Sequence, residues 1–430
     1  MTAPSPLSWG RHRCGSPTLN SPEAGNPTVT SPAADAPERS GFRWVMLAGV
    51  SLLYGCFGLL MAATAALVTP IRTDLGLSGA AMGTILGAWQ FVYLFTAIPA
   101  GSLLDRFGLR PCLLAAALIL AASAALRALA EDYWTLLFAM MIYGVGGPLI
   151  SIGAPKLVRR WFDDASRGLA MGIYTSSTAI GSILGLTLSN AVLMPLVDYR
   201  WRTVFLVYAA VLLAAALIWF AIMSRPTSRL GQRRMAPAAM IDFGLVTELV
   251  RYPSVRNVLL LAAGVFLFAH SMGAWLPETI HSLGYSLAAA GAWAAVPVAV
   301  GIVATLVIPR LAVGPRRVTL FALLCVVGAV SLVTLYSESR ALMTTSLVLQ
   351  GVSRSCIFPI AMLLLMESRR INSDNMGAAG GLFFTAAQVG GVLGPVLFGV
   401  LVDATGDYRY PLWSLAAVCI AMAVWVRRLR

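Results

Sequence analysis

Apolar runs of about 20 residues recur along the whole chain, and this repetition limits the possible folds more than any other feature. A run of that length is enough for an α-helix to cross the hydrocarbon core of a bilayer. Only 11% of the 430 residues are charged and 58% are hydrophobic, which is too little charge for the surface of a soluble protein. The runs do not alternate apolar and polar residues, so a transmembrane β-barrel is excluded. The sequence therefore predicts an all-α integral membrane protein.

The apolar runs divide into twelve predicted spans, six on each side of a polar, Arg-rich stretch. The spans are predicted at approximately 44–68, 80–104, 111–130, 134–155, 168–192, 203–224, 257–280, 287–309, 318–336, 341–366, 376–401 and 410–427. We therefore expect a disordered tail (1–40), a six-helix half (41–224), a linker (225–256) and a second six-helix half (257–430). The tail is rich in Pro, Ser and Thr, has no apolar core and lacks the hydrophobic region of a signal peptide.

The distribution of Lys and Arg predicts how the spans are oriented. With both termini in the cytoplasm, 24 of the 31 Lys and Arg residues fall in the tail, the inner loops and the C-terminus. The six assigned to outer loops are Arg72, Arg127, Arg200, Arg202, Arg340 and Arg409. Positive residues accumulate on cytoplasmic loops, so the net charge of +13 indicates topology and not nucleic-acid binding.

The loop between the second and third spans carries a recognisable motif. It reads Gly101-Ser-Leu-Leu-Asp-Arg-Phe-Gly-Leu-Arg110 and resembles the signature loop of the major facilitator superfamily. The resemblance extends over residues 44 to 427 and implies the major facilitator fold of two six-helix halves. It also implies alternating access in a cytoplasmic (inner) membrane.

The residues of this motif are predicted to form a gate: Gly101, Asp105, Arg106, Gly108 and Arg110. Asp105 can pair with a cation or with the positive N-terminus of a helix, which the resemblance identifies as that of span eleven. An acid adds nothing to the positive-inside bias, so a gate role is favoured for Asp105, whereas Arg106 and Arg110 serve equally well as topology anchors. Gly101 permits a close helix approach and Gly108 a tight turn. The corresponding stretch of the second half, 309–317, has no acid.

Arg354 is the candidate for substrate binding with the strongest physical argument. It falls near the middle of span ten, where a charge costs about 2.5–3.5 kcal/mol on insertion scales. We see no acid inside a predicted span that could pair with it. Its planar fork of donors suits a carboxylate or a similar oxyanion, so we expect Arg354 to bind an anionic substrate. The alternative is an Arg that bonds backbone carbonyls beside Pro359.

Polar side chains on other predicted spans are candidates for the rest of the site. His270 in span seven could bind substrate, carry a proton or form a neutral helix-packing hydrogen bond. In the superfamily, spans two, five and eleven border the central cavity, and here they carry Gln90, Tyr93, Tyr174 and Gln388. The pairs Gly83/Gly87, Gly181/Gly185 and Gly390/Gly394 are predicted to form close helix contacts only.

Two further stretches resemble the cyanate and nitroimidazole transporter branch and other organic-anion porters: Ala274-Trp-Leu-Pro-Glu278 and 154–162. The predicted function is secondary active transport of a small organic anion. A multidrug exporter driven by proton antiport is the alternative, but spans one to six hold no buried acid. A non-transporting membrane sensor is a further alternative. No metalloprotease, hydrolase or nucleotide-loop motif occurs, so we predict no enzyme, cofactor or metal site.

The predicted partners follow from this function. They are a small-molecule substrate, the lipid bilayer, and a coupling proton or counter-substrate. No nucleic acid is expected as a partner. We expect a monomer, because one chain already contains both halves.

Overall fold

A computed structural model describes residues 36–229, 243–314, 316–337, 339–368, 371–372 and 375–429. These residues contain twelve helices long and apolar enough to cross a membrane, and no strand, so the predicted all-α, twelve-span fold is confirmed. The helices are α1 (Ala36–Ala66), α2 (Val68–Leu75), α3 (Gly79–Phe107), α4 (Leu109–Ala128), α5 (Tyr133–Trp161), α6 (Asp164–Leu188), α7 (Met194–Leu196), α8 (Trp201–Ser224), α9 (Phe243–Arg251), α10 (Pro253–Ser282), α11 (Leu287–Val307), α12 (Arg316–Leu335), α13 (Arg340–Met366), α14 (Met376–Thr405) and α15 (Arg409–Trp425).

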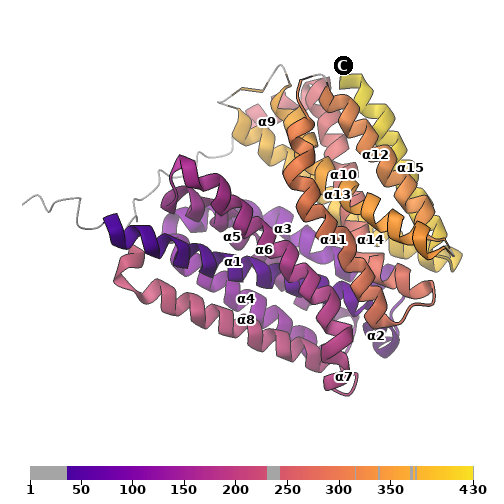
Figure 1. Cartoon of the computed structure of the whole chain (residues 1–430), viewed down its shortest axis with the longest axis horizontal. Helices are drawn as coiled ribbons and strands as arrows, with labels where there is room; N and C mark the ends of the chain where they lie inside the picture. The colour runs from indigo at the N-terminus through magenta and orange to yellow at the C-terminus, as the bar shows by residue number, and fades with distance from the viewer. Residues whose placement is uncertain are drawn as a thin grey trace, which may run out of the picture.

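Two groups of six spans lie side by side, α1 to α8 in one and α10 to α15 in the other (Figure 1). We call them the N-half and the C-half. The short helix α9 lies within the stretch predicted as the linker (225–256), and α10 begins at Pro253, slightly before the predicted start of the second half. Helix α1 begins at Ala36, inside the segment predicted as a tail (1–40). The predicted disorder of residues 1–35 lies outside the described residues.

Local sequence signals explain where several spans begin. Ser78, Asp132 and Asp163 have extended backbones, and each side chain accepts an N–H three residues later. Such caps satisfy backbone donors that the first helical turn leaves without a partner. Proline inside spans, as at Pro359 and Pro395, is tolerated because neighbouring helices can satisfy the freed carbonyl groups.

The three predicted glycine pairs are confirmed as sites of close helix contact. A Cβ atom at Gly181 would overlap the carbonyl group of Gly55, and one at Gly390 would overlap that of Ala263. At Gly87, an added Cβ would lie 2.9 Å from the carbonyl oxygen of Val392. These glycines join α6 to α1, α14 to α10, and α3 to α14. The last of these contacts joins the two halves.

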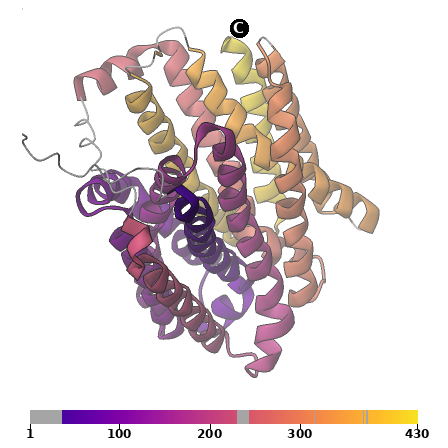
Figure 2. The same cartoon turned by 60° about the vertical axis from the view of Figure 1, so that its left-hand side comes forward.

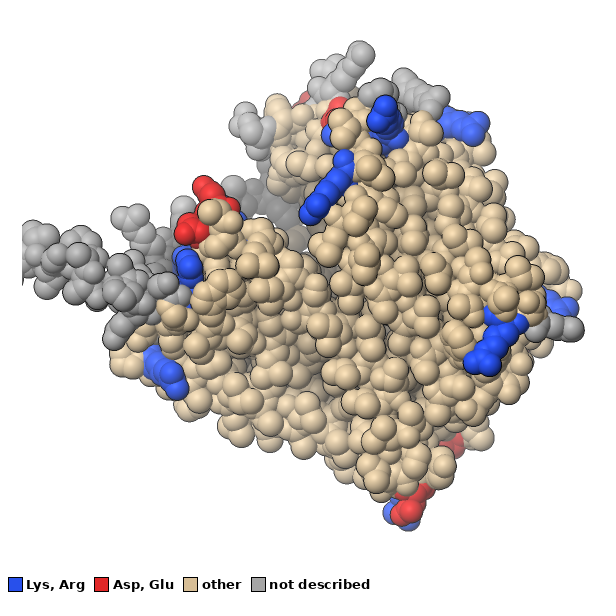
Figure 3. Space-filling view, in the orientation of Figure 1, with Lys and Arg blue, Asp and Glu red and all other residues tan. Residues whose placement is uncertain are grey.

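Helices α3 and α14 touch at one end of the bundle and are apart at the other. Where α3 begins and α14 ends, a Cβ at Gly79 would lie 2.7 Å from the Gly399 carbonyl oxygen; we call this the closed end. Where α3 ends and α14 begins, Gly101, Gly377 and Gly381 have nothing within 4 Å of an added Cβ; we call this the open end. The halves diverge from the closed end in both ribbon views (Figures 1 and 2), and a notch separates them in the space-filling view (Figure 3).

The predicted place of Arg127 in an outer loop is wrong. Arg127 is fully buried in the last turn of α4, inside the N-half. Its guanidinium donates to the Leu60 carbonyl oxygen at 3.2 Å, to the Thr64 hydroxyl and to the Ser123 hydroxyl at 3.3 Å. It also lies over the Tyr143 ring, 5.1 Å from the centroid. Arg127 therefore links α1, α4 and α5 through neutral partners.

The glycine contacts predict a difference in stability between two substitutions on the same helix. Gly390→Ala should destabilise the purified protein by about 1–3 kcal/mol, because the new methyl group must displace the α10 backbone. Gly381→Ala should leave stability unchanged or slightly raised, because the space around it is open. Thermal unfolding in detergent measures both. Equal stability of the two variants would contradict the close α10–α14 contact.

Candidate functional site

Arg354 lies at the middle of its span, with 14 residues of α13 before it and 12 after it. Its side chain is half-buried and faces α10, where its Nη1 atom lies 3.9 Å from the Cβ position of Gly273. It forms no hydrogen bond, ion pair or ring contact with any residue in the described part of the chain. The contrast with the three hydrogen bonds of Arg127 makes Arg354 the candidate site for a ligand with negative charge.

His270 brings the two halves into contact one helical turn away from Gly273. The amide nitrogen of Gln90, on α3, donates to Nδ1 of His270, on α10, at 3.0 Å. The imidazole ring also packs against Trp89 of α3, with ring centroids 5.6 Å apart. Two of the residues predicted from sequence, Gln90 and His270, therefore form a direct link between the N-half and the C-half.

Gln388 meets the same group of residues from α14. A Cβ added at Gly391 would lie 3.3 Å from Oε1 of Gln388, 3.3 Å from Cδ2 of His270 and 3.4 Å from Cγ of Gln90. The absence of a side chain at Gly391 lets these three side chains approach one another. We refer to Gln90, His270, Gln388 and Arg354 as the central cluster.

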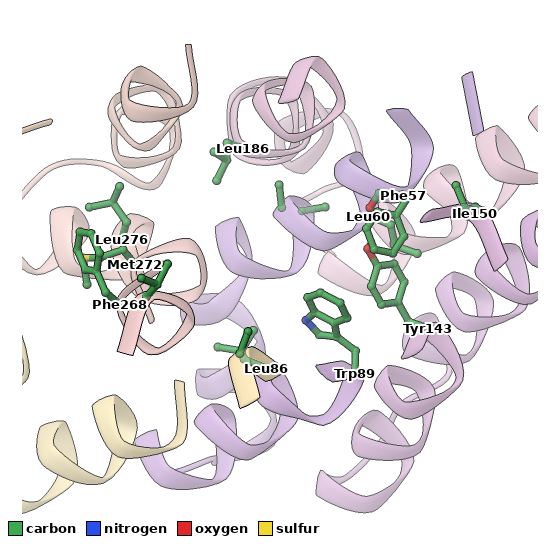
Figure 4. Close-up of a cluster of buried hydrophobic side chains, with 14 of the residues drawn as sticks. Phe57, Leu60, Leu86, Trp89, Tyr143, Ile150, Leu186, Phe268, Met272 and Leu276 are labelled. Atoms are coloured by element: carbon green, nitrogen blue, oxygen red, sulfur yellow. Dashed lines mark hydrogen bonds between the residues drawn. The ribbon is translucent and has the colours of Figure 1, made fainter. Parts of the chain in front are cut away.

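Aromatic side chains extend from the central cluster into the N-half. Figure 4 shows Trp89 beside Phe57 and Tyr143, across from Phe268 and Met272 of α10. The rings of Trp89 and Phe57 are 6.0 Å apart, and those of Phe57 and Tyr143 stack at 4.9 Å.

Two predicted site residues join the central cluster only through this aromatic group. Tyr174 contacts Tyr54 edge-on at 5.5 Å. The hydroxyl group of Tyr93 forms a hydrogen bond with the hydroxyl group of Ser151, with 2.8 Å between the two oxygens. The structure therefore places both tyrosines beside the cluster but not within it, and their roles in binding stay predictions.

Glu278 is an acid inside a span, but it pairs with groups other than Arg354. This residue is 9% exposed, in α10 near the closed end. It accepts a hydrogen bond from the Thr69 hydroxyl and one from the Tyr408 hydroxyl at 3.2 Å, and it lies 3.6 Å from the Arg72 guanidinium. Burial, together with the Glu278 carboxylate, raises the pKa of Tyr408, so its hydroxyl stays protonated and donates. Glu278 thus joins the halves at the closed end.

A second acid strengthens the closed end. Asp403, near the end of α14, accepts the backbone N–H groups of Gly79 and Ala80 at 2.7 Å each. These groups form the N-terminus of α3, where the helix dipole favours a negative charge. The link between Asp403 and α3 therefore crosses from the C-half to the N-half.

The predicted gate residues lie at the open end, where the structure gives Asp105 a partner in its own half. Asp105 accepts a hydrogen bond from Lys156 of α5 at 2.7 Å, with both side chains mostly buried. Gly108 has a φ of 88° at the turn between α3 and α4, as a tight turn there requires. Arg106 lies over the Phe107 ring at 5.3 Å, and the Arg110 carbonyl accepts the Trp219 indole N–H at 3.0 Å. Their gate roles stay predictions.

The C-half has an ion pair of its own that its loop motif did not reveal. Arg317, at the start of α12, pairs with Glu367, which directly follows α13. In the N-half, Asp105 at the end of α3 pairs with Lys156 of α5. Glu367 lies 50 positions after Arg317 in the sequence, so a search of the loop alone could not find this pair.

Twelve spans in two halves, joined at one end and parted at the other around a polar mid-span cluster, define a multi-pass membrane transporter. The model of the Major Facilitator Superfamily matches residues 50–378 and 312–430, and the chain belongs to this family. A bacterial homolog of the human lysosomal transporter Spinster, in an inward-facing and occupied conformation, has the same fold. Its TM-score is 0.73 at 14% identity, covering 90% of this chain and 97% of that chain.

The curated relatives of this chain include transporters of several kinds. The hexuronate transporter of Bacillus subtilis is 24% identical over 355 residues, covering 79% of this chain and 83% of the relative. The 2-nitroimidazole transporter of Escherichia coli is 26% identical over 393 residues, covering 89% and 94%. The probable sulfoacetate transporter SauU of Cupriavidus necator is 25% identical over 374 residues, covering 81% and 84%.

The contacts at the closed end predict that Glu278→Gln opens this end. Loss of a partly buried charge-assisted contact costs about 1.5–3 kcal/mol, which would raise the population of the opened state about tenfold or more. Spin labels at Thr73 and Ala404, both exposed and on different halves, would report a shift to longer distances. The labels require a background in which the six native cysteines are replaced.

Arg409→Gln is the matched control for this measurement. Its ion pair with Asp407, at 3.9 Å, lies at the same end but within the C-half, so the distances should not change. If Glu278→Gln also left the distances unchanged, the Glu278 contacts would not be what holds this end closed.

Proposed function

We propose that the protein is a secondary active transporter that moves a small organic anion across the cytoplasmic membrane by alternating access. The observation that carries this proposal is Arg354, a guanidinium at mid-span with no partner among the described residues. Retaining an unpaired charge there is costly unless a ligand neutralises it. An incoming carboxylate or sulfonate would supply that missing charge.

The shape of the bundle supports a path to this site. The α3–α14 contact seals the closed end, and the same helices part at the open end, so the central cluster is reached from the open end. The loops at the open end include those predicted to carry most of the Lys and Arg, so we assign the open end to the cytoplasm. Opening of the closed end, with approach of α3 and α14 at the open end, would then expose the site to the other side.

Relatives support the charge of the solute without identifying it. The names of two reported relatives refer to anions, hexuronate and sulfoacetate, and one refers to 2-nitroimidazole. The central cluster contains a cation and no acid among the described residues, whereas an exporter of cationic drugs needs a negative group to bind them. Glu278, the acid in α10, already forms an ion pair with Arg72 at the closed end.

Binding measurements test the role of Arg354. A bound ligand raises the melting temperature by mass action, so small mono- and dicarboxylates, sulfonates, neutral solutes and cationic drugs can be compared by thermal shift. We expect anions to stabilise the wild-type protein. Arg354→Gln should weaken anion binding about 10- to 150-fold, because the variant loses one charge-assisted hydrogen bond to the ligand. Arg340→Gln is the matched control, because Arg340 is exposed at the start of the same helix.

Each alternative function predicts a different outcome. Stabilisation by cationic drugs or neutral solutes, unchanged in Arg354→Gln, would contradict the proposal and favour the multidrug exporter. Stabilisation by an anion that proteoliposomes then fail to take up or exchange would favour the non-transporting sensor.

A further inference from the structure

Two amide oxygens in the central cluster have no hydrogen-bond partner. Gln90 is 2% exposed and Gln388 is 5% exposed. The nitrogen of the Gln90 amide is used by His270, but Oε1 of Gln90 and Oε1 of Gln388 are buried without a partner among the described residues. A buried polar group left unsatisfied costs about 1–3 kcal/mol, so each of these two oxygens points to a missing donor.

The two glutamine side chains come from different halves and approach each other beside Gly391. Oε1 of Gln388 and Cγ of Gln90 lie 3.3 and 3.4 Å from the same Cβ position of Gly391. A ligand group that bonds both glutamine side chains would therefore lie where the two halves meet. Away from the closed end, the bond from Gln90 to His270 is the one side-chain hydrogen bond that joins the halves in the described part of the chain. A ligand that bridges Gln90 and Gln388 would add another.

The anion site lies within reach of this point. Arg354 approaches Gly273, which is one turn of α10 beyond His270. One turn of helix rises about 5.4 Å, a separation that a short carbon chain spans. A carboxylate at Arg354 can therefore belong to the same molecule as a donor group at Gln90 and Gln388.

The surrounding charges favour a hydroxyl group as that donor. A ligand ammonium would lie near the Arg354 guanidinium, where two positive charges repel, and the described residues of the cluster supply no carboxylate to offset this. A hydroxyl group donates without adding charge, and it can donate to one amide oxygen while accepting from the amide nitrogen of the other glutamine.

We propose that the transported solute is a hydroxy acid, held by its carboxylate at Arg354 and by a hydroxyl group between Gln90 and Gln388. This inference rests on the anion site of the proposed function and adds the second recognition element. The hydroxyl group makes the solute a bridge between the two halves, so the same contact that selects the solute also draws the halves together.

Matched acids with and without hydroxyl groups test the proposal on the wild-type protein. The probes are lactate and glycerate against propionate, and gluconate against hexanoate, with affinity measured by thermal shift. A site built to hydrogen-bond a hydroxyl group rejects the analogue that lacks it, so at least one hydroxylated acid should bind at least about tenfold more tightly than its partner. Equal affinity within every pair would overturn the proposal and mean that water satisfies the amide oxygens.

Gln388→Met links the preference to the amide. Met is unbranched and similar in size but accepts hydrogen bonds only weakly. The variant should reduce the preference for the hydroxylated acid to within about twofold, because it should weaken binding of the hydroxylated acid more than that of the deoxy acid. A preference that survives in Gln388→Met and also in Gln90→Met would contradict the assigned contacts.

The outcomes separate this inference from the proposed function. If acids bind and lose affinity in Arg354→Gln, but hydroxyl groups make no difference, the anion site stands and the hydroxyl contact is wrong. If no acid stabilises the wild type at any concentration, both fail. Because the first comparison needs no variant, the proposal can be refuted even if neither substituted protein folds.

Discussion

The hydrocarbon core of a bilayer supplies no water, so each polar group inside the bundle must be satisfied by the protein or by what it binds. The backbone meets this requirement within its helices. Arg127 meets it with three neutral acceptors on α1 and α4 and the face of Tyr143. Arg354 does not meet it, although it lies at the middle of a span and faces a glycine on α10. The contrast between these two arginines is what separates a structural role from a binding role in this chain.

The closed end determines where the unsatisfied groups become accessible. Glycines let α3 and α14 approach until their backbones touch, and Asp403 holds that contact. Glu278 of α10 adds a second link at this end, to Thr69 and Arg72 of α2. The same two helices are separated at the open end, where Asp105 bonds to Lys156 within its own half. The central cluster lies between these ends. Contacts between the halves are therefore concentrated at one end, while each half keeps its own ion pair at the other.

Much of the fold followed from local sequence, because a bilayer imposes a length and an apolar composition on each span. The twelve spans and the three glycine pairs were predictable on that basis. The importance of Arg354 was also visible, since a charge in an apolar run is conspicuous. Partners distant in sequence were not predictable. Glu278 and Thr69 form a hydrogen bond although they are 209 positions apart in the sequence, and Asp105 and Lys156 are 51 positions apart.

Arg127 was misplaced for a related reason. It lies near the end of an apolar run, where an Arg in a loop and an Arg buried by a neighbouring helix have the same local sequence. Only the position of α1, which brings the Leu60 carbonyl and Thr64 to it, distinguishes the two. The convergence of Gln90, His270 and Gln388 at Gly391 likewise depends on three helices from two halves.

The central claim is that the ligand supplies the negative charge that the protein lacks around Arg354. The most direct measurement compares the affinity of the wild-type protein for a carboxylic acid that stabilises it with that for the corresponding primary amide, by isothermal titration calorimetry. The two ligands have nearly the same shape and differ by one unit of charge. The account predicts that the amide binds at least about tenfold more weakly than the acid, because the amide cannot form the charge-assisted hydrogen bond to Arg354. Equal affinity for the acid and the amide would contradict it.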